Sequence, residues 1–168
     1  MGQKTEYMDR IIELFYESPQ EEFTVREIAK RTKVPKSTVQ KYLPTLKKNG
    51  LVDPENRAHI SVWFKTKKIN YYIEKIIKTG LIAELIHTLN PSCIILFGSI
   101  RKGDSVQESD IDLFVESSLK KKILLAKYEK LLKHRIELFI ENDIHNLSPH
   151  LFNNVVNGIK LYGSFSIK

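Results

Sequence analysis

Candidate catalytic and ligand-binding residues lie between positions 95 and 116, in the stretch ILFGSIRKGDSVQESDIDLFVE. Gly98-Ser99 closes one apolar run, and Asp110-x-Asp112 opens the next apolar run after ten intervening residues. Side chains two residues apart on a strand point to the same face, so the two aspartates should converge on one spot. Two converging carboxylates repel each other unless a cation lies between them. The spacing therefore predicts a site for a divalent metal ion.

The same stretch predicts a phosphate site beside the carboxylates. Mg²⁺ prefers a few carboxylates together with triphosphate oxygens and water. Two such ions can activate an attacking hydroxyl and stabilise a leaving pyrophosphate. Gly98 lets the backbone approach phosphate without a Cβ clash, and Ser99 offers a hydroxyl and an N–H at a helix start. Arg101 and Lys102 are candidates to neutralise the triphosphate, with solvent exposure as the alternative.

Together these features resemble a known family. An apolar strand, Gly-Ser, a nearby glycine (Gly103), an acidic loop and Asp-x-Asp are similar to the signature of the DNA polymerase beta nucleotidyltransferase superfamily, in its minimal branch. The resemblance covers about residues 80 to 163. It implies transfer of a nucleoside monophosphate from a nucleoside triphosphate, with ATP as the expected donor. The hydroxyl acceptor implied is a protein, an RNA end or a small molecule.

The resemblance also implies a third carboxylate on a neighbouring strand. Glu137 is the residue that matches, although the family usually has Asp there. Asp110, Asp112 and Glu137 are therefore the expected catalytic and metal-binding residues. Glutamate is one methylene longer and could ligate metal or act as a base toward the attacking hydroxyl. The alternatives are weakened or lost catalysis, or an ordinary edge-strand charge.

The first half of the chain is strongly basic. Between Arg26 and Lys68 there are 12 basic and 3 acidic residues, a net charge of +9 in a chain whose total is +7. A concentrated basic surface is typical of nucleic-acid binding. A solvated face that keeps the protein in solution is the alternative.

The stretch from Thr24 to Val52 resembles the winged helix-turn-helix of prokaryotic transcription regulators, a resemblance that covers about the first 70 residues. In such a fold the N-terminal side chains of the third helix meet base edges in the major groove. Docking of a protein or dimerisation is the alternative use of this fold. The expected DNA-binding residues are Lys36, Ser37, Thr38, Gln40, Lys41 and, at the wing tip, Arg57, with phosphate contacts from Lys47, Lys48, Lys65, Lys67 and Lys68.

The periodicity predicts an α+β chain with an N-terminal winged helix-turn-helix and a C-terminal nucleotidyltransferase fold, a small mixed sheet flanked by helices. The predicted domains are 1–69, a connecting helix over 70–90, and 91–168. Pro44 should kink or end the third helix. We expect helices over 9–16, 25–31, 36–49, 70–87 (interrupted near Gly80), 119–135 and from Ser148-Pro149 to Gly163 or before, and strands over 51–52, 60–64, 92–97, 111–116 and 136–141.

Composition excludes several classes of protein. No apolar run approaches the length of a membrane span, and the polar start shows no secretory signal. The single cysteine, Cys93, excludes an internal disulfide and a cysteine-based zinc site. The five histidines show no metal-ligand spacing and are expected on the surface. These features lead us to expect a cytoplasmic protein.

Three functions remain open from the sequence. The first is a Mg²⁺-dependent nucleotidyltransferase, with the resemblance implying an antitoxin that adenylylates a partner ribonuclease toxin of the HEPN class. The second is a transcription regulator whose nucleotidyltransferase-like domain only senses nucleotide. The third is a scaffold in which neither site works. The expected partners are double-stranded DNA, a nucleoside triphosphate, the toxin and, because operators are usually two-fold symmetric, a second copy of the chain.

Overall fold

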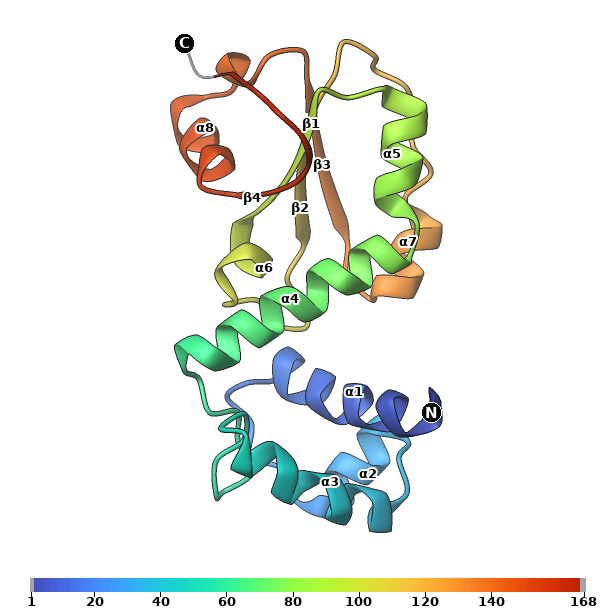
Figure 1. Cartoon of the computed structure of the whole chain (residues 1–168), viewed down its shortest axis with the longest axis vertical. Coiled ribbons are helices and arrows are strands. Elements are labelled where there is room, and N and C mark those ends of the chain that lie inside the picture. Colours follow the sequence, from blue (N-terminus) through green and yellow to red (C-terminus); the bar gives the residue numbers. More distant parts are fainter. Residues whose placement is uncertain (1, 167–168) are drawn as a thin grey trace. The chain divides into compact units, whose positions relative to one another are not determined.

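The computed structural model describes residues 2–166 and divides into two compact units (Figure 1). Unit 1 comprises the chain up to Lys68 together with Ser105–Gln107. Unit 2 comprises Ile69–Asp104 and the chain from Glu108 onward. In residues 2–166 no helix has both the length and the apolar character that crossing a bilayer requires.

Unit 1 is built on three packed helices, α1 (Gly2–Glu17), α2 (Val25–Thr32) and α3 (Lys36–Lys48). The spacing of Thr24 and Glu27 is that of a capping box, and one is present at the start of α2: the Thr24 side chain accepts from the Glu27 N–H, and the Glu27 carboxylate accepts from the Thr24 N–H. Lys33 then takes a left-handed conformation, which turns the chain into α3. The predicted helices over 25–31 and 36–49 are therefore confirmed, whereas the helix predicted over 9–16 begins earlier, at Gly2.

Pro44 lies inside α3 without ending it, since the helix continues to Lys48. Proline cannot donate to the preceding turn, but Leu43 and Leu46 on either side of it are buried and hold the helix against the unit's core. Gly50 then adopts the left-handed conformation expected just after a helix. The prediction that Pro44 could end the third helix early is therefore wrong.

The predicted wing is much reduced. Among the described residues it consists of one isolated antiparallel bridge between Val52 and Ala58, with the Asp53 N–H donating to the Arg57 carbonyl. The predicted strand over 60–64 is wrong, because α4 (Val62–Lys78) begins there. Trp63 and Phe64 are β-formers by type, yet Phe64 is buried in the helical register, and this packing overrides local propensity.

The predicted interruption near Gly80 is confirmed. α4 ends at Lys78, Gly80 takes a positive φ of 81°, and α5 (Leu81–Leu89) follows. Leu81, Leu85 and Leu89 are fully buried at helical spacing. α5 therefore presents one apolar face to the core of unit 2.

Unit 2 is centred on a four-stranded mixed sheet in the order β3-β2-β1-β4. β1 (Cys93–Phe97) pairs antiparallel with β2 (Ile111–Glu116) and with β4 (Ile159–Gly163), and β2 pairs parallel with β3 (Ile136–Glu141). The mixed sheet flanked by helices agrees with the predicted fold class. Strands β2 and β3 have the predicted bounds, and β1 starts one residue later.

Helices cover both faces of this sheet (Figure 1). On one face Cys93, Ile95, Phe97 and Phe114 form a cluster with Val155 of α8 (Pro149–Val156) and Ile144 of the short 3₁₀ helix η1 (Ile144–Asn146). On the other face lie α5 and α7 (Ala126–Leu132). Ile111 and Leu113 of β2 are fully buried.

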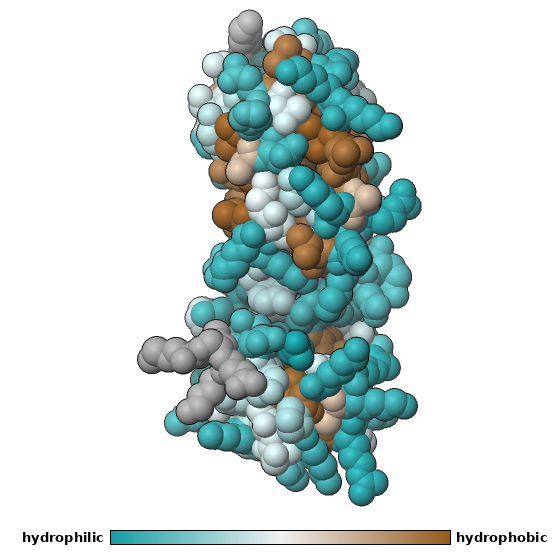
Figure 2. Space-filling view, turned by 90° about the vertical axis from the view of Figure 1, so that its right-hand side faces the viewer, coloured by the Kyte–Doolittle hydropathy of each residue, from teal (hydrophilic) through white to brown (hydrophobic). Residues whose placement is uncertain are grey.

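Two predictions for unit 2 are wrong. The expected helix over 119–135 is reduced to α7, and residues 117–125 are irregular. Leu124 lies in this irregular segment and is 73% exposed. Figure 2 shows one face of the molecule, on which hydrophobic side chains of unit 2 lie among hydrophilic ones. Ile159, expected on the last helix, belongs to β4, because α8 ends at Val156 and the chain turns at Gly158 to join the sheet.

Candidate active site

The turn from β1 into α6 (Gly98–Lys102) lies directly against Asp112 on β2. The register pairs Phe97 with Asp112, so the residue that follows Phe97 meets the aspartate side chain. Gly98 has a φ of 71°, and a Cβ added there would lie only 1.8 Å from Asp112 Oδ2. Only glycine satisfies both the left-handed backbone and this approach. Gly98 is therefore the position at which backbone and carboxylate come together.

The three predicted acids gather at one end of the sheet. Asp112 and Glu137 are direct partners in the parallel β2–β3 ladder, and Asp110 precedes Asp112 by two residues. Strand alternation places Asp112 on the same face as Phe114, the face covered by α8. Asp110 and Asp112 are half-buried, whereas Glu137 is exposed.

Burial, together with the neighbouring acids, raises the pKa of the Asp112 carboxyl to about 6. The largest cause is burial, followed by the charge of Glu137, a hydrogen bond between the two carboxyl groups and the charge of Asp110. The Asp112 carboxyl therefore keeps its proton over a wider pH range than an exposed aspartate. A cation beside these groups would remove the repulsion that raises the pKa.

The donor set suits Mg²⁺ together with a substrate. Within residues 2–166, no group of three or more His, Cys, Asp or Glu side chains is arranged to hold a metal ion on its own. Mg²⁺ does not need such a cage, because it takes one or two carboxylates and completes its shell with phosphate oxygens and water. Asp110 and Asp112, with Glu137 beside them, fit that role.

The remaining predicted nucleotide-binding residues lie on α6. Ser99 is half-buried and follows Gly98 directly, so it flanks the turn that contacts Asp112. Arg101 is half-buried and Lys102 is exposed. Ile100 between them is fully buried and fixes α6 on the sheet, and Gly103 closes the helix with a φ of 72°.

His134 contributes to the site although the sequence placed it on the surface. It is only 4% exposed, packs edge-to-face on Tyr72, and its Nδ1 donates to the Ser109 carbonyl at 2.7 Å. Asp110, which follows Ser109 in the chain, is thereby held in place just before β2 begins. The sequence signal was weak: His134 precedes the strand that pairs with β2, but nothing local marks it as buried.

The predicted DNA-binding residues of unit 1 lie together at the start of α3. Lys36, Ser37, Gln40 and Lys41 are exposed and Thr38 is half-buried, while Val39 between them is fully buried. One face of α3 therefore anchors the helix, and the opposite face presents polar and basic groups to solvent.

Two basic residues behave differently from expectation. Arg57 is exposed but paired with Glu22 at 2.6 Å, and this hydrogen bond, followed by the Glu22 charge, raises the pKa of the guanidinium. A phosphate contact by Arg57 would have to compete with Glu22. Lys68, expected to contact phosphate, is 1% exposed, and its ammonium donates to the Tyr16 carbonyl at 2.7 Å. Lys68 is a structural residue of unit 1.

Comparison with protein families gives two matches. Residues 79–165, more than half of the chain, match the polymerase beta nucleotidyltransferase family. The chain belongs to that family. Residues 19–72 match the model of the sugar-specific transcriptional regulator TrmB, so unit 1 carries a regulator-type DNA-binding domain. Neither the search of curated proteins nor that of solved structures returned a match.

Family membership agrees with the geometry of unit 2. The matched range contains the β1–α6 turn, both aspartates and Glu137. The two matches confirm the predicted fusion of a winged helix-turn-helix with a nucleotidyltransferase fold.

The close approach at Gly98 predicts a specific cost of substitution. Gly98→Ala should lower the urea midpoint of unfolding more than Gly80→Ala does. Both positions have a positive φ and share the backbone strain of about 1 kcal/mol, but only Gly98 adds a contact with Asp112, whereas a Cβ at Gly80 meets nothing within 4 Å. Equal costs for the two variants would contradict the contact.

The raised pKa of Asp112 predicts a pH-dependent effect of Asp112→Asn. The native state binds the proton more tightly than the unfolded state, so ionisation of Asp112 destabilises the protein as pH rises from the ordinary value of 3.8 through about 6. Asparagine cannot ionise. The stability of Asp112→Asn relative to wild type should therefore increase by about 1–2 kcal/mol between pH 4 and pH 7, measured by urea unfolding. A difference that is constant with pH would count against the crowded carboxylates.

Proposed function

We propose that this protein is a metal-dependent nucleotidyltransferase that transfers AMP from ATP to a hydroxyl acceptor, and that its unit 1 binds double-stranded DNA. The observation that carries the enzymatic proposal is the position of the Asp112 carboxyl, between the Gly98 turn on one side and Glu137 on the other. This arrangement offers a phosphate-approachable backbone and clustered acids at one spot.

The reaction requires the acceptor oxygen to bond to the α-phosphorus while the bond from that phosphorus to the bridging β-oxygen breaks. The pyrophosphate leaves with the electron pair, and the acceptor hydroxyl loses its proton. Glu137 is the exposed acid of the site, so it is accessible to an acceptor and is the group proposed to take that proton. Ser99 and Arg101, both on α6, are proposed to orient the triphosphate.

Mg²⁺ held by Asp110 and Asp112 would neutralise charge on the triphosphate and the leaving pyrophosphate. The chain's own contribution is to hold these two carboxylates in place. Ile111 lies between the two aspartates and Leu113 follows them, and both side chains anchor β2 in the core. His134 holds the Ser109 carbonyl, which immediately precedes Asp110. This anchoring keeps two like charges close before any cation arrives.

For the acceptor we propose a hydroxyl on a partner protein. The resemblance to minimal nucleotidyltransferases suggests a HEPN-type ribonuclease toxin, which would make this chain its antitoxin. An N-terminal DNA-binding unit suits such a role, because an antitoxin that binds its own operator can control both genes.

A nucleotide sensor without catalysis is the second candidate function, and Glu137 is the observation that favours it. Glu137 replaces the family's usual aspartate. The charge of Glu137 also contributes to the raised pKa of Asp112, so the Asp112 carboxyl gives up less readily the proton that a cation would displace. In that case nucleotide would bind without being transferred, and DNA affinity would change with nucleotide.

Labelled-nucleotide transfer decides between the two. With α-labelled ATP, Mg²⁺ and cell extract as the acceptor source, wild type should label an acceptor, and Asp110→Ala and Asp112→Ala should lose at least about a hundredfold of that rate. Glu137→Gln should bind ATP as wild type does but transfer more slowly, because the amide cannot accept the proton. Parallel reactions with the other three nucleotides test the donor base.

Glu141→Gln is the matched control. Glu141 lies four residues along the same strand and pairs with Lys120 at 3.6 Å, away from the Asp112 partner position. Its activity should match wild type. If the wild-type protein bound nucleotide without transferring it, that result would contradict the enzymatic proposal and support the nucleotide sensor.

DNA binding is tested independently of catalysis. Lys36→Ala combined with Lys41→Ala should weaken binding to duplex DNA about tenfold and flatten its salt dependence, since each phosphate contact adds about 0.9 to the slope. Lys121→Ala with Lys122→Ala removes the same charge from unit 2 and should change affinity by less than about twofold. No salt-sensitive shift of duplex DNA by wild type at low ionic strength would contradict the proposal.

A further inference from the structure

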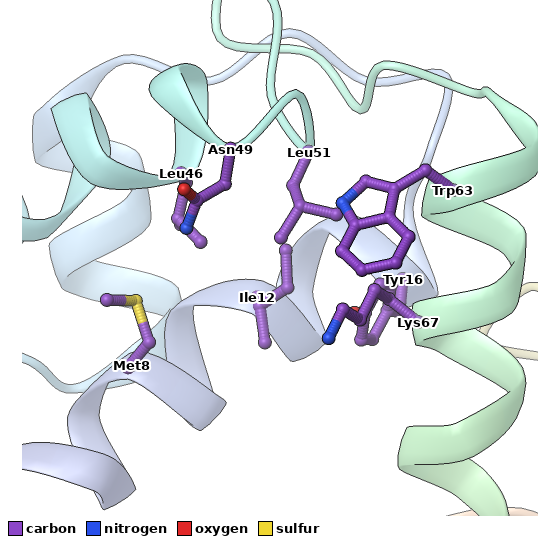
Figure 3. Close-up of a pocket in the computed structure, with 8 residues that line it drawn as sticks. All are labelled: Met8, Ile12, Tyr16, Leu46, Asn49, Leu51, Trp63 and Lys67. Atoms are coloured by element: carbon purple, nitrogen blue, oxygen red, sulfur yellow. The ribbon is translucent and has the colours of Figure 1, made fainter.

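Unit 1 contains a pocket whose lining includes none of the α3 residues proposed to read DNA bases (Figure 3). The lining does include Lys67, which the sequence predicted to contact phosphate. The volume of the pocket is about 390 Å³, within the range of about 300–1,000 Å³ that small-molecule sites occupy. We call it the Trp63 pocket. It is lined by α1, the C-terminal end of α3, the residue that opens the wing and the first turns of α4, through Met8, Ile12, Tyr16, Leu46, Asn49, Leu51, Trp63 and Lys67.

The lining is apolar at its base. Ile12, Leu46 and Leu51 are 5%, 3% and 8% exposed and belong to the core of unit 1, so they form a firm floor. Trp63 is 50% exposed, and its indole ring forms a wall of the pocket in Figure 3. A large aromatic side chain left half in water beside a preformed hollow leaves a flat apolar surface for a ligand to cover.

One end of the lining is cationic. The Lys67 ammonium lies 4.4 Å from the centroid of the Trp63 ring. In the described part of the chain no carboxylate pairs with Lys67, whereas Arg57 of the same unit has such a partner in Glu22. Lys67 therefore offers a positive charge held in place by an aromatic face.

Two further polar groups border the space. The Asn49 side chain is exposed and makes no hydrogen bond with the described residues. Burial, and then the charge of Asp9, raises the pKa of Tyr16, so its phenol stays protonated. Asn49 and Tyr16 are therefore neutral, and Asp9 is not among the residues that line the pocket.

We propose that the Trp63 pocket binds an organic anion with a flat apolar body. The ring system would lie on Trp63 over Ile12 and Leu51, and the carboxylate or sulfonate would meet the Lys67 ammonium. The Asn49 amide is placed to hydrogen-bond an oxygen of the same ligand. A few polar groups converging on a mainly apolar hollow are what fix the orientation of a small ligand.

The charges argue against a second copy of the chain as the occupant. A two-fold interface brings the same patch of both copies together, so Lys67 would face the basic surface of its mate. The segment from Arg26 to Lys68 carries a net charge of +9, which makes that approach repulsive. The concave shape and the cation both fit a small anionic molecule better.

Fluorescence tests the proposal directly, because Trp63 is the single tryptophan of the chain. The anionic probe is 8-anilino-1-naphthalenesulfonate, and the neutral probe is N-phenyl-1-naphthylamine, which has a similar ring system without the sulfonate. Both should quench Trp63 in a saturable way, with the anion binding more tightly at low salt. The difference in affinity should shrink at high salt, because ions screen the exposed Lys67 charge.

Lys67→Met keeps the apolar stem and removes the charge. It should weaken binding of the anionic probe about tenfold and leave the neutral probe within about twofold of wild type. Lys48→Met, which alters an exposed lysine near the end of α3 that does not line the pocket, is the matched control and should change neither affinity.

Three results would overturn the proposal. Absence of saturable quenching by either probe in wild type would show that the pocket does not bind such ligands. Equal effects of Lys67→Met on both probes would remove the role of the charge. A Trp63 emission that varies with protein concentration, together with a dimer mass in light scattering, would assign this face to a second copy. The wild-type comparison of the two probes stands even if a variant fails to fold.

Discussion

In unit 2 the Gly98 turn packs directly against the Asp112 carboxylate, and this contact sets the path of the chain around the candidate site. β1 and β2 pair so that Phe97 faces Asp112, and the chain must then leave the strand with a left-handed residue that has no side chain. Ile100 and Gly103 turn α6 back onto the sheet, and the connection returns to β2 at Asp110. A phosphate-approachable backbone and an acid are thereby fixed side by side before any ligand binds.

The clustering of these acids destabilises the native state, and this destabilisation indicates a functional role for the cluster. Burial and two neighbouring acids raise the pKa of Asp112 to about 6, so ionising the cluster at neutral pH destabilises the native state. A fold selected for stability alone would not place acids this way. Glu137, exposed and in register with Asp112, is the group whose role separates an enzyme from a sensor.

The basic residues of unit 1 fall into two groups: some are buried or paired within the fold, and others are exposed to solvent. Lys68 is buried on a backbone carbonyl and Arg57 is paired with Glu22, whereas Lys36 and Lys41 remain exposed on α3. A count of basic residues therefore overstates the surface available to DNA. Lys67 adds a third role, because it lies on the Trp63 ring at the edge of an apolar hollow.

Local sequence patterns determined the features whose causes are local. The Thr24–Glu27 capping box, the alternation that gives β2 and β3 and the glycine break at Gly80 need only near neighbours in the chain, and the motif of Gly98 with Asp110 and Asp112 could be read from spacing alone. Tertiary packing decided what spacing could not. The helix in place of a strand at Val62, the burial of His134, the fourth strand after Gly158, the pairing of Asp112 with Glu137 and the Trp63 pocket all depend on contacts between distant segments. Strand register and burial depend on which surfaces of distant segments pack against each other, and a single sequence does not show which surfaces these are.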